Sequence, residues 1–396
     1  MPGPLHGVRI VDLTSVVMGP YATQILGDMG ADIIKVESGA GDSLRQNGRG
    51  HHAGMGPLFL QMNRSKRSIV LDLKDPLGYQ AMLAVLESAD VFMFNVRPES
   101  MARLNLAYED VARVNPRIVY CGLHGFGEGG PYSGKSAYDD MIQGASGIAA
   151  LAARAGGEPR YVPSAMADRI AGMTGVYSVL AALLHREKTG EGQALVVPMF
   201  ERMVEFVLSD HLYGWTFEPP LYEAGYPRQL APHRKPYATK DGYICVMPYV
   251  DKHWHRFFEL AGLPHLRDDP RFTNLASRTQ HIAALYQILA EALLTRTSAQ
   301  WLADLDAVDI PVMPLHTIES VVEDPHLEAV GFFQTVEHPT EGPIRTMAVP
   351  VGWSRTRPSP ERQAPRLGEH TEEVLREVGF DEAGIRAITG AAAEPV

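Results

Sequence analysis

Short runs of apolar residues recur along the first half of the chain, and glycine, proline or polar residues bound each run. Runs of about four to eight residues with this composition are typical of buried strands. Between them, Pro20 can open a helix in its first turn and Gly30 can close it, and residues 76–89 show a second helical pattern. Strands that alternate with helices predict an α/β fold with a mostly parallel sheet. We expect its strands in GVRIVDL (7–13), ADIIKVE (31–37), SIVLDL (68–73), DVFMFN (90–95), RIVYCGLHGF (117–126) and QALVVPM (193–199).

The pattern changes after about residue 215. Residues 215–237 are rich in proline and aromatic residues and are typical of a linker. YICVMPYV (243–250) predicts a strand, Asp251 is placed to cap the helix that follows, and DIPVMPL (309–315) predicts another strand. We therefore predict a large α/β domain over residues 1–215 and a smaller α+β domain over residues 220–330.

Composition and charge narrow the functions that fit this chain. It has 396 residues with a net charge of −11, which argues against general affinity for nucleic acid or for an acidic membrane surface. Its two cysteines argue against a disulfide scaffold or a zinc–cysteine site. The start of the chain lacks a signal-peptide pattern, and no apolar run approaches about 18 residues. We expect a cytoplasmic protein without a membrane-spanning helix.

Resident cofactors are not favoured by the motifs. The histidine pairs at 51–52 and 253–255 have no cysteine or carboxylate at a recognised zinc spacing, so we expect no metal site. The glycine-rich turns KTGEGQ and GFGEGGPY lack the spacing of a dinucleotide-binding or P-loop motif, and no G-x-S-x-G hydrolase elbow is present. We therefore expect no permanently bound cofactor.

Several basic residues follow predicted strands. Arg97 comes directly after the strand DVFMFN, and Arg103 and Lys135 lie in loops or near helix ends. Ligands of open α/β sheets bind at the carboxyl ends of the strands. A row of cations at that edge suits a polyanionic ligand such as a phosphorylated cofactor.

One carboxylate stands out in the segment AMADRIAGMTG (165–175). Asp168 lies among small apolar residues and glycines, and the apolar helical stretch VYSVLAALL (176–184) follows. A carboxylate against a core is costly unless it is hydrogen-bonded or useful. Aspartate is favoured at helix N-caps, so a helix cap is one interpretation and a functional carboxylate is the other.

An ordered set of motifs resembles the class III CoA-transferases, the family of formyl-CoA transferase and carnitine CoA-transferase. The sister enzyme of that family is α-methylacyl-CoA racemase. The resemblance covers nearly the whole chain. Its motifs are GVRIVDLTSVVMGPYATQILGDMGADIIKVE, NRSKRSIVLDLKDPLG, NVRPESMARL, NPRIVYCGLHGFGEGGPY, AYDDMIQGASG, MADRIAGMTG, REKTGEGQALVVPM, DIPVMPLHTIESVVEDPHLEAVGFF and GEHTEEVL.

The resemblance implies a mechanism in which Asp168 is the catalytic nucleophile. Its carboxylate attacks an acyl-CoA thioester to form a mixed anhydride, and the released CoA thiolate then forms an enzyme-bound thioester. An acceptor acid reverses the sequence. A helix N-terminus beside Asp168 would keep it ionised.

The resemblance also implies binding roles, with CoA along the sheet edge of a Rossmann-like large domain. Tyr138 and Asp139 match positions near the acyl group, and Val17 stands where formyl-CoA transferase has glutamine. Formate and oxalate are therefore not favoured, and a small dicarboxylic acid with succinyl-CoA as donor is the family's default. The family further implies an interlocked homodimer in which residues 331–396 complete the large domain. Positions that match CoA contacts are Val16, Arg97, Arg103, Lys135 and Met199, and further candidates for phosphate contact are Arg64, Lys66 and Arg67.

Two alternatives remain beside the transferase. A racemase needs a base on each face of the substrate, and its motif has His then Asp where this chain has Tyr138 and Asp139. Tyrosine, with an ordinary pKa near 10, is a poor base at neutral pH, and Asp168 alone cannot serve both faces. A non-catalytic CoA-binding protein would keep the basic contacts without needing Asp168. The retained Asp168 motif favours the transferase.

Overall fold

The computed structural model describes residues 3–392 and divides the chain into two units. The first unit comprises residues up to 146, Val162–Val204 and the chain from His326 onward, and the second comprises Gly147–Tyr161 and Glu205–Pro325. The division differs from our predicted boundaries, because residues 147–161 and 205–215 belong to the second unit and residues 326–330 belong to the first.

The chain breaks where we expected one helix near residues 139–153. Helix α6 (Asp139–Ala145) ends before Gly147, whose φ of 90° is left-handed, and α7 (Ile148–Arg154) begins after it. The guanidinium of Arg154 then donates to the carbonyl of Ala224 at 2.8 Å. This tie within the second unit accounts for the place of α7.

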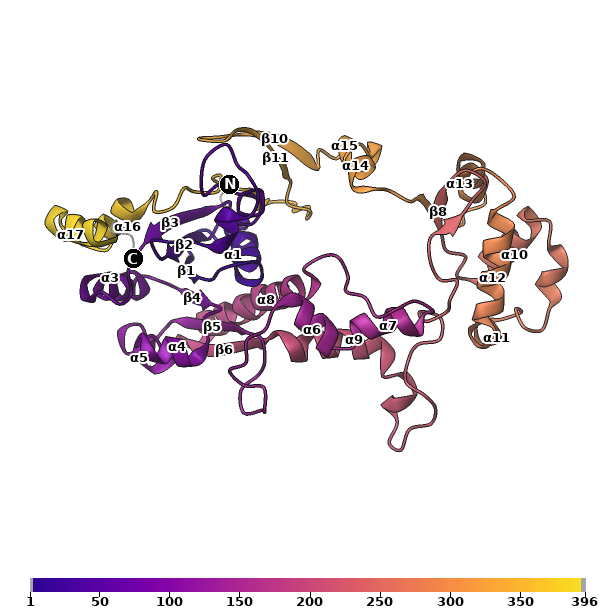
Figure 1. The fold of residues 1–396 in the computed structure, drawn as a ribbon, viewed down its shortest axis with the longest axis horizontal. Coiled ribbons are helices and arrows are strands. Elements are labelled where there is room, and N and C mark those ends of the chain that lie inside the picture. Colours follow the sequence, from indigo (N-terminus) through magenta and orange to yellow (C-terminus); the bar gives the residue numbers. More distant parts are fainter. Residues whose placement is uncertain (1–2, 393–396) are drawn as a thin grey trace. The chain divides into compact units, whose positions relative to one another are not determined.

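A six-stranded parallel sheet forms the centre of the first unit (Figure 1). All six predicted strands are present, which confirms the α/β fold class. The strand order β3-β2-β1-β4-β5-β6 reverses direction between β1 and β4, as in doubly wound nucleotide-binding folds. The strands are β1 (Arg9–Leu13), β2 (Asp32–Glu37), β3 (Lys66–Val70), β4 (Val91–Phe94), β5 (Val119–His124) and β6 (Gln193–Pro198).

Alternate strand residues supply the cores on the two faces of this sheet. One face contributes residues such as Val11, Phe92 and Tyr120 to a core that includes α3, α4, α5, α16 and α17. The C-terminal helices therefore pack within the first unit (Figure 1). These helices are α3 (Pro76–Glu87), α4 (Pro98–Arg103), α5 (Tyr108–Val114), α16 (Thr371–Glu377) and α17 (Glu382–Ala392).

Helices α1 (Met18–Asp28) and α8 (Met166–Thr189) pack against each other beside the sheet. A Cβ atom built on Gly172 of α8 would lie 2.6 Å from the carbonyl oxygen of Met18, so only glycine permits this approach. The remaining elements of the first unit are α2 (Pro57–Met62), the start of α9 (Met199–His211), the 3₁₀ helix η1 (Ser43–Gln46) and the antiparallel hairpin β10 (Phe333–His338) and β11 (Gly342–Met347).

Helix α8 is long and apolar enough, by length and composition alone, to cross a membrane. We expected no such helix, because no uninterrupted apolar run is long enough. In the structure, α8 packs on α1, β5 and β6, and its Arg186 donates to the Asp90 carboxylate at 2.8 Å. These contacts are those of a core helix.

The second unit holds a small antiparallel sheet of order β7-β8-β9 and an aromatic core. Trp254, Phe257 and Trp301 are buried in this core. Asp251 begins α10 but does not cap it: the N-cap is Val250, and the Asp251 carboxylate pairs with Arg278. Its other elements are β7 (Tyr237–Ala238), β8 (Tyr243–Val246), β9 (Val312–Pro314), α10 (Asp251–Leu260), α11 (Leu275–Gln280), α12 (Ile282–Leu293), α13 (Ser298–Ala307), α14 (Ile318–Val321), η2 (Tyr213–Thr216) and η3 (Pro264–Asp268), and α15 (Pro325–Ala329) begins at its last residue.

The contact between α1 and α8 can be tested with one substitution at two helical glycines. Gly172→Ala forces α1 and α8 apart, and we expect a loss of about 1–3 kcal/mol of stability. Gly390→Ala, in α17, meets no atom within 4 Å and should be neutral or stabilising by up to about 1 kcal/mol. Urea unfolding of both variants measures the difference, and equal effects would contradict the close approach.

Candidate active site

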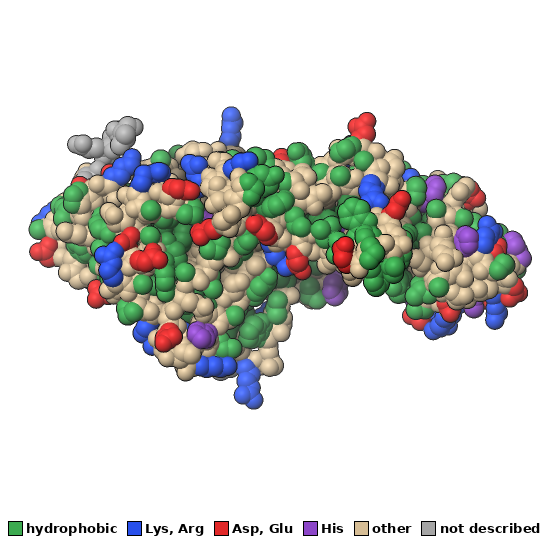
Figure 2. Space-filling view, turned by 90° about the horizontal axis from the view of Figure 1, so that it is seen from below, with side chains coloured by type: hydrophobic (Ala, Val, Ile, Leu, Met, Phe, Trp, Pro, Cys, Tyr) green, Lys and Arg blue, Asp and Glu red, His purple; other side chains and the backbone are tan. Residues whose placement is uncertain are grey.

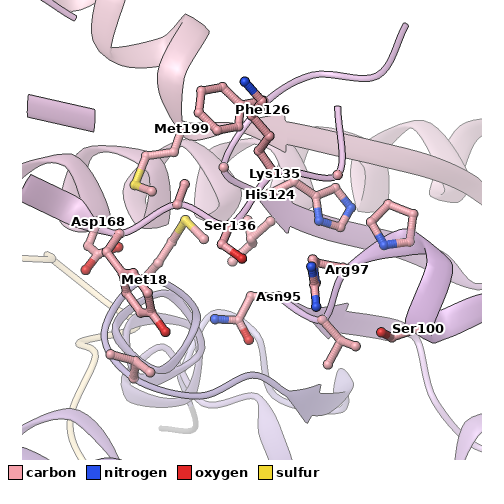
Figure 3. Close-up of a pocket in the computed structure, with 18 of the residues that line it drawn as sticks. Met18, Asn95, Arg97, Ser100, His124, Phe126, Lys135, Ser136, Asp168 and Met199 are labelled. Carbon is pink, nitrogen blue, oxygen red and sulfur yellow. The ribbon is translucent and has the colours of Figure 1, made fainter. Parts of the chain in front are cut away.

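A cavity of about 410 Å³ lies at the carboxyl ends of the parallel strands, in the first unit (Figure 3). The segments that follow β1 and β4 line it, so it is at the point where the strand order reverses. The end of β5 and the segment that follows it to Glu128, residues 133–138, Asp168 of α8 and Met199 of α9 complete the lining.

Asp168 is the third residue of α8, and its side chain faces the cavity beside Met18 and Met199 (Figure 3). The N-cap of α8 is Ala165, which offers no side-chain cap. The backbone N–H of Asp168 instead donates to Oδ1 of Asp139 at 2.9 Å. The cap interpretation of Asp168 is therefore wrong: Asp139 serves the helix start, and the Asp168 carboxyl remains available to a ligand.

Gln143 fixes Asp139 and the chain that leads into α8. Its Nε2 atom donates to Oδ2 of Asp139 at 2.6 Å and to the carbonyl of Ser164 at 3.2 Å. Its Oε1 atom accepts from the N–H of Val162 at 2.8 Å. Both Gln143 and Asp139 are buried, so these bonds are shielded from water and hold the start of α8 in place.

The pKa of Asp168 is raised to about 6, and burial is the largest cause. The neighbouring Asp139 carboxylate also raises it, and the nearby Arg169 lowers it by less. We expected the helix N-terminus to keep Asp168 ionised. Desolvation and a like charge act in the opposite direction and prevail. With a pKa of about 6, the carboxyl is still mostly ionised at pH 7 but not below pH 6.

The structure gathers most of the residues named from sequence around this cavity. Arg97 lies at the end away from Asp168, near Ser100 (Figure 3). Arg103 does not line the cavity, and its guanidinium donates to Oγ of Ser100 at 2.7 Å. Asp139 lies behind Asp168 rather than in the lining. The lining includes Val16, Val17, Arg97, Lys135, Tyr138, Asp168 and Met199.

The three basic residues of NRSKRS are not free to bind phosphate. Arg64 pairs with Asp28 at 2.8 Å, Lys66 with Asp12 at 3.1 Å, and Arg67 with Asp32 at 2.6 Å. All three cations are buried. Their proposed phosphate contact is therefore wrong, because carboxylates from other strands and helices already neutralise them.

Asn95 and His124 are two of several polar lining residues that sequence reasoning missed. The others are Ser15, Ser100, Glu128, Ser133 and Ser136. His124 ends β5 and is buried, and its burial lowers the pKa of the imidazole. Asn95 binds the backbone of Ser15 with both ends of its amide, at 3.0 and 2.9 Å. Asn95 is the last residue of the predicted strand 90–95, and His124 is among the last three residues of the predicted strand 117–126, so their place at the sheet edge was the available signal.

Metal and thiol chemistry find little support in the described part of the chain. Residues 3–392 hold no group of three His, Cys, Asp or Glu side chains that could bind a metal ion. Cys121 is buried, and its burial raises the pKa of the thiol to about 12. An inert thiol is what the apolar run RIVYC indicates.

The doubly wound fold and the cavity at its switch point define the class of α/β proteins that bind a ligand at the carboxyl edge of the sheet. Lys135 and Arg97 supply positive charge there, while Glu128 and Asp168 contribute carboxyl groups to the same lining. The Lys135 ammonium also lies 4.4 Å from the centre of the Tyr132 ring. On the face in Figure 2, basic side chains are scattered among acidic and apolar ones. Because the whole chain has a net charge of −11, an anionic ligand would have to be attracted by cations close to the site.

Comparisons with known proteins agree with this class. The sequence model of CoA-transferase family III matches residues 5–371. The chain is 32% identical over 390 residues to mouse succinyl-CoA:glutarate CoA-transferase. The alignment covers 97% of this chain and 89% of the mouse protein. The chain is 31% identical over 389 residues to the succinyl-CoA:mesaconate CoA-transferase of Haloarcula hispanica, with 95% and 97% covered.

A solved structure of a CaiB/BaiF family protein from Brucella suis superimposes with a TM-score of 0.81 at 29% identity, and covers 96% of this chain and all of that one. The chain therefore belongs to CoA-transferase family III. This confirms the resemblance seen in the sequence and identifies the protein as an enzyme of CoA transfer.

Removing the Arg97 charge tests whether the cavity holds CoA. We expect Arg97→Gln to raise the dissociation constant of CoA about tenfold or more, because a charge-assisted bond to phosphate is lost. Arg113→Gln removes a charge from α5, outside the cavity lining, and should leave the affinity unchanged. Isothermal titration with CoA measures both, and equal losses would argue against a CoA site at this cavity.

Proposed function

We propose that this enzyme moves CoA from an acyl-CoA donor to a small carboxylic acid, with Asp168 as the nucleophile. The observation that carries the proposal is the layout of the cavity: the Asp168 carboxyl faces one end and Arg97 the other. A CoA thioester has that polarity, because its phosphates are anionic and its reactive carbonyl is remote from them.

In the proposed reaction, a carboxylate oxygen of Asp168 attacks the thioester carbonyl, and the C–S bond breaks to release CoA thiolate. The product is a mixed anhydride between Asp168 and the acyl group. The thiolate then attacks the Asp168 carbonyl and expels the donor acid as a carboxylate. The acceptor carboxylate attacks the resulting aspartyl thioester, and the thiolate finally takes the acyl group from the second anhydride and frees Asp168.

The chain's own residues supply positioning and the exclusion of water. Asp139 holds the backbone N–H of Asp168 and so fixes the first turn of α8. Met18 and Met199 are buried beside the carboxyl and limit the access of water, which would hydrolyse an anhydride. Arg97 and Lys135 suit the phosphates of CoA.

Succinyl-CoA and a small dicarboxylic acid are the proposed substrate pair. Two relatives are named for succinyl-CoA with glutarate and with mesaconate. Val17 lines the cavity with an apolar side chain where formyl-CoA transferase has glutamine. By family resemblance we also propose a cytoplasmic homodimer without a permanently bound cofactor, and light scattering of the purified protein tests the dimer.

Replacing Asp168 tests the nucleophile directly. We expect Asp168→Asn and Asp168→Ala to abolish transfer from succinyl-CoA to glutarate, because neither side chain can form the anhydride. Both variants should still bind CoA. Hydroxylamine quenching followed by mass spectrometry should mark Asp168 in the native enzyme only. Near-normal transfer in either variant would overturn the mechanism, and deuterium exchange beside the thioester carbonyl without an adduct would favour a racemase.

The raised pKa of Asp168 predicts an acid limb in the pH profile of transfer. Attack requires the ionised carboxylate, so activity should fall about tenfold per unit as the pH drops below about 6. Asp139→Asn removes the like charge and should move this midpoint to lower pH.

The matched control is Asp140→Asn, which removes an exposed charge from the same helical turn. It should leave the midpoint in place. The profile of kcat/KM between pH 4.5 and 8 decides, and a midpoint that both variants shift equally would contradict the role given to Asp139.

A further inference from the structure

Val16 has an unusual backbone conformation for a β-branched residue. Its φ of 68° lies in the left-handed region, where the branched side chain is strained. Val16 lies between β1 and α1, and it lines the cavity together with Val17 and Met18. Such strain persists only where surrounding contacts over-determine the conformation.

Hydrogen bonds hold the three residues from Thr14 to Val16. The Nζ atom of Lys35 donates to the carbonyl of Thr14 at 2.8 Å. Asn95 binds both the N–H and the carbonyl of Ser15. The N–H of Val16 donates to Oδ1 of Asp42 at 3.2 Å.

Two of these partners form a buried ion pair. Lys35 Nζ and Asp42 Oδ2 are 3.0 Å apart, and their side chains are 0% and 1% exposed. One member of the pair thus binds the backbone before Val16, and the other binds Val16 itself. A buried pair adds little net stability over apolar residues, so its hydrogen bonds to the backbone of a strained loop call for another explanation.

We propose that Lys35 and Asp42 are a positioning pair that keeps Val16 left-handed and so fixes Val17 and Met18 opposite Asp168. The pair lies behind the loop and acts on the reaction only through the backbone it holds. The kinetic part of this proposal rests on the proposed function.

A second buried pair in the same unit supplies a matched comparison. Asp28 pairs with Arg64 and also accepts from the hydroxyl of Ser65, whose φ of 62° is likewise left-handed. Asp28 ends α1, and none of these three residues lines the cavity. Loss of Asp28 should therefore cost stability without altering the geometry around Asp168.

A double-mutant cycle between Asp42 and Val16 tests the proposal, because glycine adopts a left-handed φ without strain. With succinyl-CoA and glutarate as probes, Asp42→Ala should lower kcat about tenfold or more while the KM for succinyl-CoA changes less. In the V16G background, the same substitution should cost about threefold or less. Asp42→Asn keeps an oxygen for the Val16 N–H and should retain most of the activity.

Two results would overturn the positioning role. One is an equal loss of kcat from D42A with and without V16G. The other is a loss of kcat in Asp28→Ala that matches the loss in Asp42→Ala at a similar melting temperature. If D42A does not fold, D42N is compared with and without V16G. D42N should keep most of the activity in both backgrounds, and a loss of kcat of about tenfold that V16G does not relieve would overturn the role.

Hydrogen–deuterium exchange separates this proposal from the proposed function. Asp42→Ala should speed exchange of the amides of residues 14–18 more than Asp28→Ala does, whether or not the enzyme accepts these substrates. If Asp42→Ala speeds exchange but the native enzyme shows no transfer activity, the proposed substrates are wrong and the positioning role stands. Unchanged exchange in Asp42→Ala would overturn the positioning role of Lys35 and Asp42, even if the enzyme is active with these substrates.

Discussion

The site depends on a set of charged side chains buried beneath the carboxyl ends of β1 and β2. Three carboxylates and three cations meet there, so the formal charge of the set is balanced. Its members form three ion pairs at 3.0, 2.7 and 3.1 Å: Lys35–Asp42, Arg45–Glu37 and Lys66–Asp12. Removing one member would leave an uncompensated buried charge, which costs far more than the pair contributes.

The balance inside this set sets the ionisation of its members. Although burial opposes ionisation, Lys66 and Lys35 lower the pKa of Asp12 to about 2, and burial together with Lys35 lowers the pKa of Lys66 to about 8. Asp12 also accepts from Thr14 and Thr23, so it ties the end of β1 to the body of α1. The loop at Val16 therefore rests on groups that are buried and shielded from solvent.

Helices α1 and α8 place Met18 and Asp168 side by side in the lining of the cavity. Gly172 lets α8 approach the carbonyl of Met18, and Met18 faces the cavity beside Asp168. A shift at this contact would move the carboxyl relative to Val17. The close packing of the two helices and the buried charges beside α1 thus both fix the position of Val17 and Met18 relative to Asp168.

The sequence pattern predicted the strands well, because each is an apolar run between breakers, and it placed Arg97 and Lys135 near the carboxyl edge of the sheet. The role of Asp168 came instead from the resemblance of its motif. The sequence pattern failed for Arg64, Lys66 and Arg67, which share the local signature of a phosphate-binding loop. Their carboxylate partners lie tens of residues away, so only the fold shows that these cations are already neutralised. The left-handed conformation of Val16 was not predicted either, because a valine carries no local sequence signal for a positive φ.

The pKa of Asp168 reconciles two demands of the proposed chemistry. A carboxylate of higher basicity is a stronger nucleophile, but it must still be ionised at the working pH. Burial and Asp139 raise the pKa to about 6, which is near that compromise. Asp139 has both effects at once: its charge raises the basicity of Asp168, while its Oδ1 atom holds the backbone N–H that orients it. Under the proposed function, Asp139 therefore adds to the basicity that burial gives Asp168 and also holds the backbone of Asp168 in place.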